Sequence, residues 1–202
     1  MKREGIILII SAPSGAGKTT LCGALLDRFP NMKESISYTT RPPRAGEVHG
    51  KDYFFVTRQE FERMIDSDAF AEWAEVHGNL YGTALATIED ARTSGVDLVL
   101  DIDCQGARRL KEQIERCVYV FILPPSMDEL RRRLENRSSD AQDVIDRRIE
   151  RAAAEIREAR WYDYIIINDK LETAFEELTA IVIAHSRKTF HMLGQVAKLF
   201  DI

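Results

Sequence analysis

Ser11-Ala-Pro-Ser-Gly-Ala-Gly-Lys-Thr-Thr20 is the stretch of sequence that decides the fold. It directly follows Gly5-Ile-Ile-Leu-Ile-Ile-Ser11, an uninterrupted apolar run that predicts a parallel strand buried on both faces. It directly precedes residues 18–29, where apolar side chains recur at helical spacing before a proline ends the pattern. We therefore expect a glycine-rich turn between a buried strand and a helix.

Such a turn has the chemistry of a phosphate-binding loop. Its backbone N–H groups can point at phosphate oxygens, helped by the N-terminus of the helix that follows. Lys18 can supply a cation to the β- and γ-phosphates, and the Thr19 hydroxyl can ligate Mg²⁺. Ala12 replaces the first glycine of the usual GxxxxGK[ST] pattern, while the chemical residues stay in place. The residues expected to hold ATP are Ala12, Pro13, Ser14, Gly15, Ala16, Gly17, Lys18, Thr19 and Thr20.

The rest of the chain repeats the alternation of strand and helix. Apolar runs are each followed by a helical pattern, at residues 96–102 then 106–115, 118–123 then 127–136, and 164–167 then 171–188. This alternation predicts an α/β protein with a mostly parallel sheet flanked by helices on both faces.

Two regions break this rhythm within what we interpret as a single domain spanning residues 1–202. Residues 37–93 contain short alternating segments and a capping-box pattern at Thr57, which predict an inserted mixed subdomain. Residues 126–160 are helical and rich in arginine, and predict a lid whose tip lies near Ser138. The core would then comprise residues of about 1–36, 94–125 and 161–202.

Composition narrows the class of protein. The formal net charge of −5 is not that of a nucleic-acid-binding protein, and the apolar run near the N-terminus is too short for a membrane span or an export signal. The cysteines are Cys22, Cys104 and Cys117, an odd number without metal-ligand spacing, which favours a reducing, cytoplasmic location. Residues 188–202 have helical spacing and can pack on the core or on another subunit of a homo-oligomer.

A second segment carries groups suited to a phosphorylated acceptor. Arg41 and Arg44 lie three residues apart among prolines, and guanidinium forks suit a dianionic phosphate. Tyr53 can add a neutral donor, and Glu72 offers a carboxylate on an alternating strand. A carboxylate can accept from two adjacent N–H groups, which guanine presents at N1 and its 2-amino group and adenine does not. Solvated loop arginines and a water-facing Glu72 are the plainer interpretations.

At these residues the chain resembles the guanylate kinases. Their signature T-[ST]-R-x-x-[KR]-x-x-[DE]-x-x-G-x-x-Y is matched by Thr39, Thr40, Arg41, Arg44, Glu47, Gly50 and Tyr53. The similarity extends from about Ile6 to about His185 through Tyr81-Gly-Thr83, Asp101-Ile-Asp-Cys-Gln-Gly106 and Ile167-Asn-Asp169. It implies a P-loop kinase fold and Mg²⁺-dependent, reversible transfer of the ATP γ-phosphoryl group to GMP, or to dGMP, which would supply guanine nucleotides.

The resemblance also implies roles for individual residues. Ser37, Glu72 and Asp103 would recognise guanine. The GMP phosphate would be held by Arg41, Arg44, Tyr53 and Tyr81. Thr83 and Asp101 would line the site, with Asp101 near the Mg²⁺ that Thr19 ligates, and Asn168 would lie near adenine. The resemblance places Arg133, Arg137 and Arg148 over the triphosphate; with Lys18 and Arg41 they form the expected catalytic set.

Two other functions stay open on the sequence alone. Domains related to guanylate kinases also serve as non-enzymatic interaction modules, but Lys18 and Thr19 argue for a working phosphate loop. A phosphate-loop kinase for another nucleoside monophosphate is the second alternative, and Glu72 with its guanine-reading neighbours argues against it.

Overall fold

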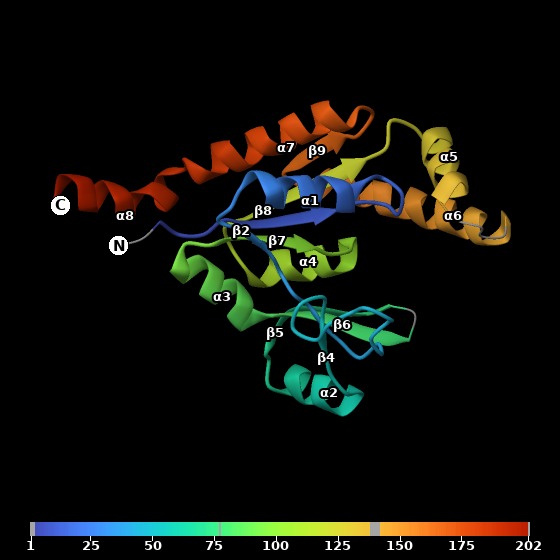
Figure 1. Ribbon diagram of the computed structural model, residues 1–202, viewed down its shortest axis with the longest axis horizontal. Coiled ribbons are helices and arrows are strands. Elements are labelled where there is room, and N and C mark those ends of the chain that lie inside the picture. Colours follow the sequence, from blue (N-terminus) through green and yellow to red (C-terminus); the bar gives the residue numbers. More distant parts are fainter. Residues whose placement is uncertain (1–2, 77, 138–141, 202) are drawn as a thin grey trace.

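The computed structural model describes residues 3–76, 78–137 and 142–201, with Arg137 described through its backbone alone. Its centre is a five-stranded sheet in the order β2-β7-β1-β8-β9, in which every neighbouring pair is parallel. The strands are β1 (Ile7–Ser11), β2 (Met32–Glu34), β7 (Asp97–Asp101), β8 (Cys117–Leu123) and β9 (Tyr164–Ile167). Parallel neighbours require crossover connections, and helices supply them on both faces (Figure 1). The predicted α/β class is confirmed.

The apolar run of β1 is buried on both faces because its side chains alternate between two cores. Leu8 and Ile10 belong to the cluster formed with α1 (Lys18–Arg28) and α7 (Leu171–Ser186). Ile7 and Ile9 belong to the opposite cluster, with α3 (Leu85–Ser94) and α4 (Cys104–Gln113). Burial of both faces fixes β1 in the sheet, and with it the position of the loop that follows.

Some helices and strands begin at residues other than those expected from the periodicity of apolar residues. The helix expected from residue 106 begins at Cys104, because the Asp103 carboxylate caps it by accepting from the Gly106 N–H at 2.8 Å. The short strand β2 was not predicted. Only Met32 of its three residues is buried, so its sequence is too short to show the alternation of apolar residues that indicates a strand.

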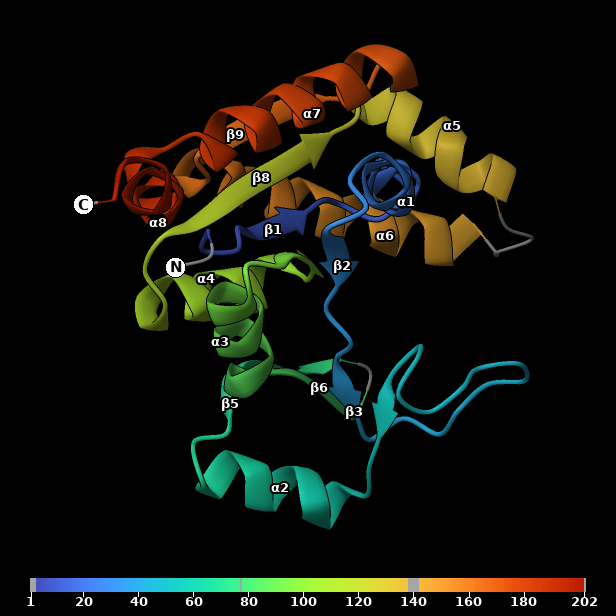
Figure 2. The ribbon, with the colours of Figure 1, turned by 60° about the vertical axis from the view of Figure 1, so that its left-hand side comes forward.

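A smaller mixed sheet lies below the main one, with the strand order β4-β3-β6-β5 (Figure 2). Its strands are β3 (Tyr38–Thr39), β4 (Phe54–Phe55), β5 (Phe70–Val76) and β6 (Asn79–Ala84). The helix α2 (Arg58–Asp66) begins at the predicted Thr57 capping box and stacks Phe61 on Phe70 with ring centroids 4.3 Å apart. The division of the chain into core, inserted subdomain and lid at the residues given above remains a prediction.

The arginine-rich region forms α5 (Met127–Arg137) and α6 (Gln142–Glu158), which continues into the short helix η1 (Ala159–Trp161). Leu130 and Leu134 pack against Ile145 and other apolar residues of α6. Ser126 caps α5 by accepting from the Glu129 N–H at 3.0 Å. The predicted lid tip at residues 138–140 and the Arg137 side chain lie outside the described residues.

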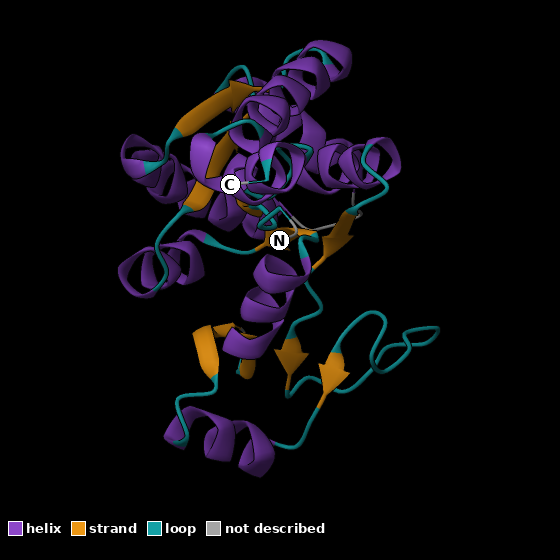
Figure 3. Ribbon diagram, turned by 90° about the vertical axis from the view of Figure 1, so that its left-hand side faces the viewer, coloured by secondary structure: helices purple, strands orange, loops and turns teal. Residues whose placement is uncertain are grey.

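The last helix, α8 (Thr189–Phe200), matches the helical spacing of the C-terminal stretch. His191 attaches it to the N-terminal segment through a hydrogen bond between Nδ1 and the Glu4 carbonyl oxygen at 3.1 Å, and both chain ends face the viewer in Figure 3. Leu193 and Phe200 stay exposed, and the homo-oligomer remains a prediction. In the described part of the chain, every helix is too short or too polar to cross a bilayer.

Candidate functional site

The phosphate loop lies between β1 and α1 in the expected place. Gly15 and Gly17 both have φ of 94°, and Gly17 caps α1 in the left-handed conformation. A Cβ on Gly17 would lie 2.3 Å from Asn168 Nδ2, so the position requires glycine for space as well as for conformation. Ala12 is not among the positive-φ residues, so the turn does not need the glycine that usually stands there.

Two distant elements hold this loop in shape. The buried Asn168 side chain, just after β9, donates from Nδ2 to the Ala16 carbonyl oxygen at 2.8 Å. From α6, Arg148 donates to the Ser14 hydroxyl at 2.7 Å. Arg148 and Asn168 therefore both contact the phosphate loop, while their roles toward a nucleotide remain predictions.

Lys18 and Asp101 form an ion pair where α1 begins and β7 ends. Strand carboxyl ends border the ligand crevice in open α/β sheets, so this pair lies where the chemistry is expected. Thr19, the next residue of α1, is exposed. A hydroxyl and a carboxylate suit Mg²⁺, which typically takes its other ligands from phosphates and water. No cluster of three or more His, Cys, Asp or Glu side chains that could hold a metal ion occurs among the described residues.

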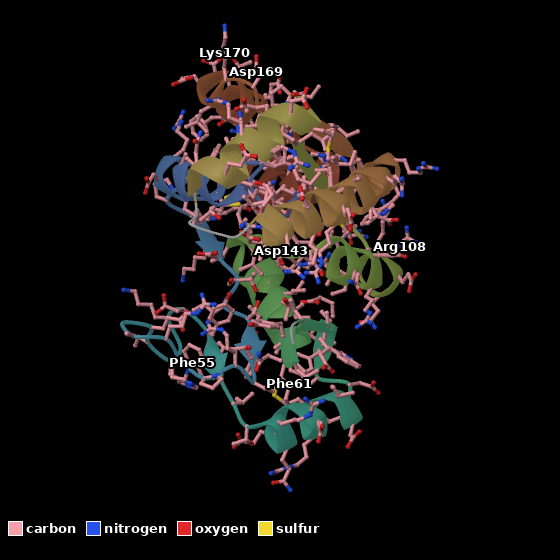
Figure 4. The ribbon with its side chains drawn as sticks, turned by 90° about the vertical axis from the view of Figure 1, so that its right-hand side faces the viewer. Phe55, Phe61, Arg108, Asp143, Asp169 and Lys170 are labelled. Carbon is pink, nitrogen blue, oxygen red and sulfur yellow. The ribbon has the colours of Figure 1, made fainter. Side chains whose placement is uncertain are left out.

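A cavity of about 360 Å³ opens beside the loop on the side of α5 and α7. Its walls are formed by Gly15, Gly17, Thr20, Arg133, Asn136, Asn168, Asp169 and Leu171. Arg133 of this wall makes two hydrogen bonds. Its Nη2 donates to the Asn168 carbonyl oxygen at 2.9 Å, and its Nε donates to Glu129 Oε1 at 2.7 Å. Figure 4 labels Asp169 and Lys170 where β9 leads into α7.

A second cavity, of about 170 Å³, lies between the small sheet and the end of β7. Six of the residues expected to bind the acceptor line it together, namely Ser37, Tyr53, Glu72, Tyr81, Asp101 and Asp103. Asp101 therefore faces the second cavity and pairs with the lysine of the phosphate loop. The ion pair thus joins the wall of the second cavity to the loop whose glycines line the first.

Glu72 is the buried acid of the second cavity, only 6% exposed. Burial raises the pKa of its carboxyl to about 7, against the opposing hydrogen bond from Thr83, and the nearby Asp103 charge adds to the rise. Thr83, expected to line the site, donates to Glu72 Oε1 at 2.7 Å and so helps to orient the acid.

Two further residues shape the surroundings of Glu72 without having been singled out from sequence. A Cβ on Gly106 would lie 2.6 Å from Glu72 Oε2, so only glycine lets α4 approach the carboxylate this closely. Arg109 lies over the Trp73 ring and bonds the Trp73 carbonyl oxygen, which ties α4 to β5. Gly106 belongs to the Asp101–Gly106 motif, but the need for glycine there comes from its approach to Glu72, which is distant in the sequence.

Of the two phosphate-binding candidates from the proline-flanked segment, Arg41 contacts a residue of this cavity wall, Tyr53. The Arg41 guanidinium lies over the rings of Tyr53 and Phe55, 5.4 and 5.8 Å from their centroids, and donates to Glu47 Oε1 at 2.8 Å. Arg44 is exposed. Its backbone N–H donates to Glu47 Oε2 at 2.7 Å. Tyr53 and Tyr81, both in the cavity wall, meet edge to face with centroids 6.0 Å apart.

Comparison with known proteins gives a consistent result over almost the whole chain. A family model described as guanylate kinase matches residues 4–185. Guanylate kinases of Geobacter metallireducens and Geobacter sulfurreducens are 62% and 61% identical over 202 residues, covering 100% of this chain and 100% of each relative. The crystal structure of guanylate kinase from Anaplasma phagocytophilum is similar with a TM-score of 0.76 at 39% identity, covering 98% of this chain and 95% of that one.

Proposed function

The chain belongs to the guanylate kinase family, and we propose that it phosphorylates GMP from ATP near the Lys18–Asp101 ion pair. The observation that carries this assignment is the second cavity, which is lined by six expected acceptor residues, one of them the buried acid Glu72. The interaction-module alternative does not account for a loop lysine paired with a carboxylate of that cavity wall.

On the donor side, the loop residues 12–20 bind the triphosphate of ATP, with the α1 N-terminus directed at it. Asn168 lies beside the adenine, in the wall of the larger cavity. Thr19 and, through water, Asp101 would hold Mg²⁺, which would offset charge on the β- and γ-phosphates. Lys18 exchanges its Asp101 partner for phosphate oxygens, so the ion pair holds the lysine in place until ATP arrives.

On the acceptor side, the Glu72 carboxylate accepts from guanine N1–H and the 2-amino group, and Ser37 and Asp103 complete base recognition. Arg41, Arg44, Tyr53 and Tyr81 bind the GMP phosphate. In this arrangement the base of GMP enters the smaller cavity and meets Glu72, while its phosphate stays near Arg41 and Arg44.

Transfer itself needs no nucleophilic side chain. A GMP phosphate oxygen attacks the γ-phosphorus in line, and at neutral pH that phosphate is largely ionised, so a strong general base is dispensable. Lys18 and the arginines of α5 and α6 (Arg133 and Arg148, with Arg137 as the third) offset charge on the transferred group. Closure of the lid over both cavities would exclude water and prevent ATP hydrolysis.

A coupled assay with GMP, dGMP, AMP, UMP and dTMP as acceptors tests this function. We expect turnover with GMP, lower or equal turnover with dGMP, and little with the others. Activity with AMP or UMP above that with GMP would refute the guanine assignment. An inactive protein that still binds GMP would support the module. Three free cysteines accord with the cytoplasmic location that we assign.

The pKa of Glu72 predicts how GMP affinity depends on pH. Guanine donates two N–H groups, so it binds the carboxylate and not the protonated acid. With the free-protein pKa raised to about 7 by burial, the competent form is lost as pH falls below 7. The dissociation constant should therefore rise up to about tenfold per pH unit below 7 and level off above it. Calorimetry with guanosine, which lacks a titrating phosphate, isolates this effect, and in Glu72→Gln it should vanish.

A further inference from the structure

Glu47 is the one acidic side chain among the described residues that contacts both phosphate-binding arginines. Its Oε1 accepts from Arg41 Nη2 at 2.8 Å and its Oε2 accepts from the Arg44 backbone N–H at 2.7 Å. These bonds, from Arg41 first and Arg44 second, hold the pKa of the Glu47 carboxyl below its usual range. Both oxygens are thus engaged at neutral pH, and they close the segment from Arg41 to Glu47 into a ring.

The Arg41 guanidinium is fixed on its edge and on its face at the same time. Glu47 holds one edge, while the rings of Tyr53 and Phe55 lie beneath the plane. Figure 4 labels Phe55 beside this loop, and Figure 2 shows the loop, which follows β3 in the chain, projecting away from the small sheet. A free arginine side chain carries about 2 kcal/mol of rotamer entropy, so fixing it beforehand lowers the cost of binding an anion.

We propose that Glu47 is a positioning residue that preorganises Arg41 and Arg44 for the phosphate of the acceptor nucleotide, an inference that rests on the proposed function. A guanidinium has five N–H donors, so the phosphate can bind Arg41 while Glu47 keeps its own bond. The second bond, to the Arg44 backbone, lies outside any exchange with the phosphate and keeps the loop closed throughout.

The opposite role would be that of a placeholder, an anion that occupies Arg41 until the phosphate displaces it. The two roles predict effects of opposite sign, because removing a competing anion strengthens GMP binding and removing a support weakens it. The anchored Oε2 favours support: a pure competitor would need only the contact with Arg41.

Glu47→Gln tests the proposal, because the amide keeps the shape and loses the charge and one acceptor. Asp52→Asn is the matched control: Asp52 Oδ2 accepts from the Val48 N–H at 2.7 Å in the same loop, away from the arginines. Calorimetry with GMP, guanosine and ATP on each protein should show GMP binding to Glu47→Gln weakened about tenfold, the effect of one lost charge-assisted bond. Guanosine and ATP should change less than twofold, and Asp52→Asn should behave as the parent protein does.

Tighter GMP binding by Glu47→Gln would overturn the proposal in favour of the placeholder. An equal loss for guanosine and GMP, or the same loss in Asp52→Asn, would show only a structural contribution of the loop and would also overturn it. If the glutamine variant unfolds, Glu47→Asp, which keeps the charge and shortens the side chain, replaces it in the test. GMP binding should again weaken while guanosine binding stays nearly unchanged. A parent protein that fails to bind GMP would instead refute the proposed function itself.

Discussion

Replacing Lys18 with methionine should abolish phosphoryl transfer while leaving GMP binding nearly unchanged. The ammonium group lies at the start of α1, next to the loop proposed to bind the triphosphate, and pairs with Asp101 in the wall of the second cavity. Its charge is needed most when negative charge moves onto the transferred group, so its loss acts on the transition state. We expect kcat to fall by roughly a thousandfold or more, judging from the loss of comparable preorganised donors.

The measurement is a steady-state assay of kcat together with calorimetry for GMP alone. Lys170→Met serves as the control, because Lys170 is an exposed lysine at the start of α7, beside the donor cavity, and carries the same charge. A Lys18→Met protein with parental kcat would refute the catalytic role of the loop. A large loss of GMP affinity would show that the lysine serves the acceptor cavity instead.

The part of this site that could be predicted from the sequence is the part whose causes are local. The buried strand, the glycine turn and the helix of the phosphate loop follow one another in the chain, so their pattern predicts their structure. Tyr164–Ile167 was likewise delimited correctly by its apolar character. The Ala12 departure had no structural consequence, because φ at that position is ordinary.

The remaining features depend on contacts between segments far apart in the sequence, which no local pattern reveals. The hydrogen bond from the Thr83 hydroxyl to Glu72 arises because β5 and β6 pair antiparallel, with these two residues opposite each other. Gly106 matters only because α4 approaches the Glu72 carboxylate. The role of Glu47 likewise becomes visible only once its two oxygens are seen to reach Arg41 and the Arg44 amide.

The proposed function would couple the donor and acceptor sites through one residue. Asp101 belongs to the wall of the smaller cavity and to the ion pair with Lys18. If Lys18 turns to the phosphates of ATP, as we propose, Asp101 would be released to hold a water of the Mg²⁺ shell. A single carboxylate at the end of β7 would then link occupation of the donor site with the charge near the acceptor phosphate.

Glu72→Gln should remove guanine recognition while sparing ATP. The isosteric amide places an NH₂ group where the carboxylate had an acceptor oxygen. This NH₂ group would face an N–H donor of guanine, and neither would have an acceptor. Because this side chain is 6% exposed, water cannot relieve the mismatch. An unsatisfied buried donor costs about 1–3 kcal/mol, so two affected groups should weaken GMP binding roughly a hundredfold.

Glu75→Gln is the matched control for this change. Glu75 lies on the same strand, exposed, near an Arg58 nitrogen at 3.6 Å, and it takes no part in the cavity wall. Calorimetry with GMP and ATP separately should show the loss for Glu72→Gln with GMP alone, and no loss for Glu75→Gln. Equal weakening of both ligands would mean that Glu72 supports the fold of β5 and does not read the base. Because the amide does not titrate, the variant should also bind guanosine equally at pH 6 and pH 8, which ties the base-reading role to the raised pKa of the acid.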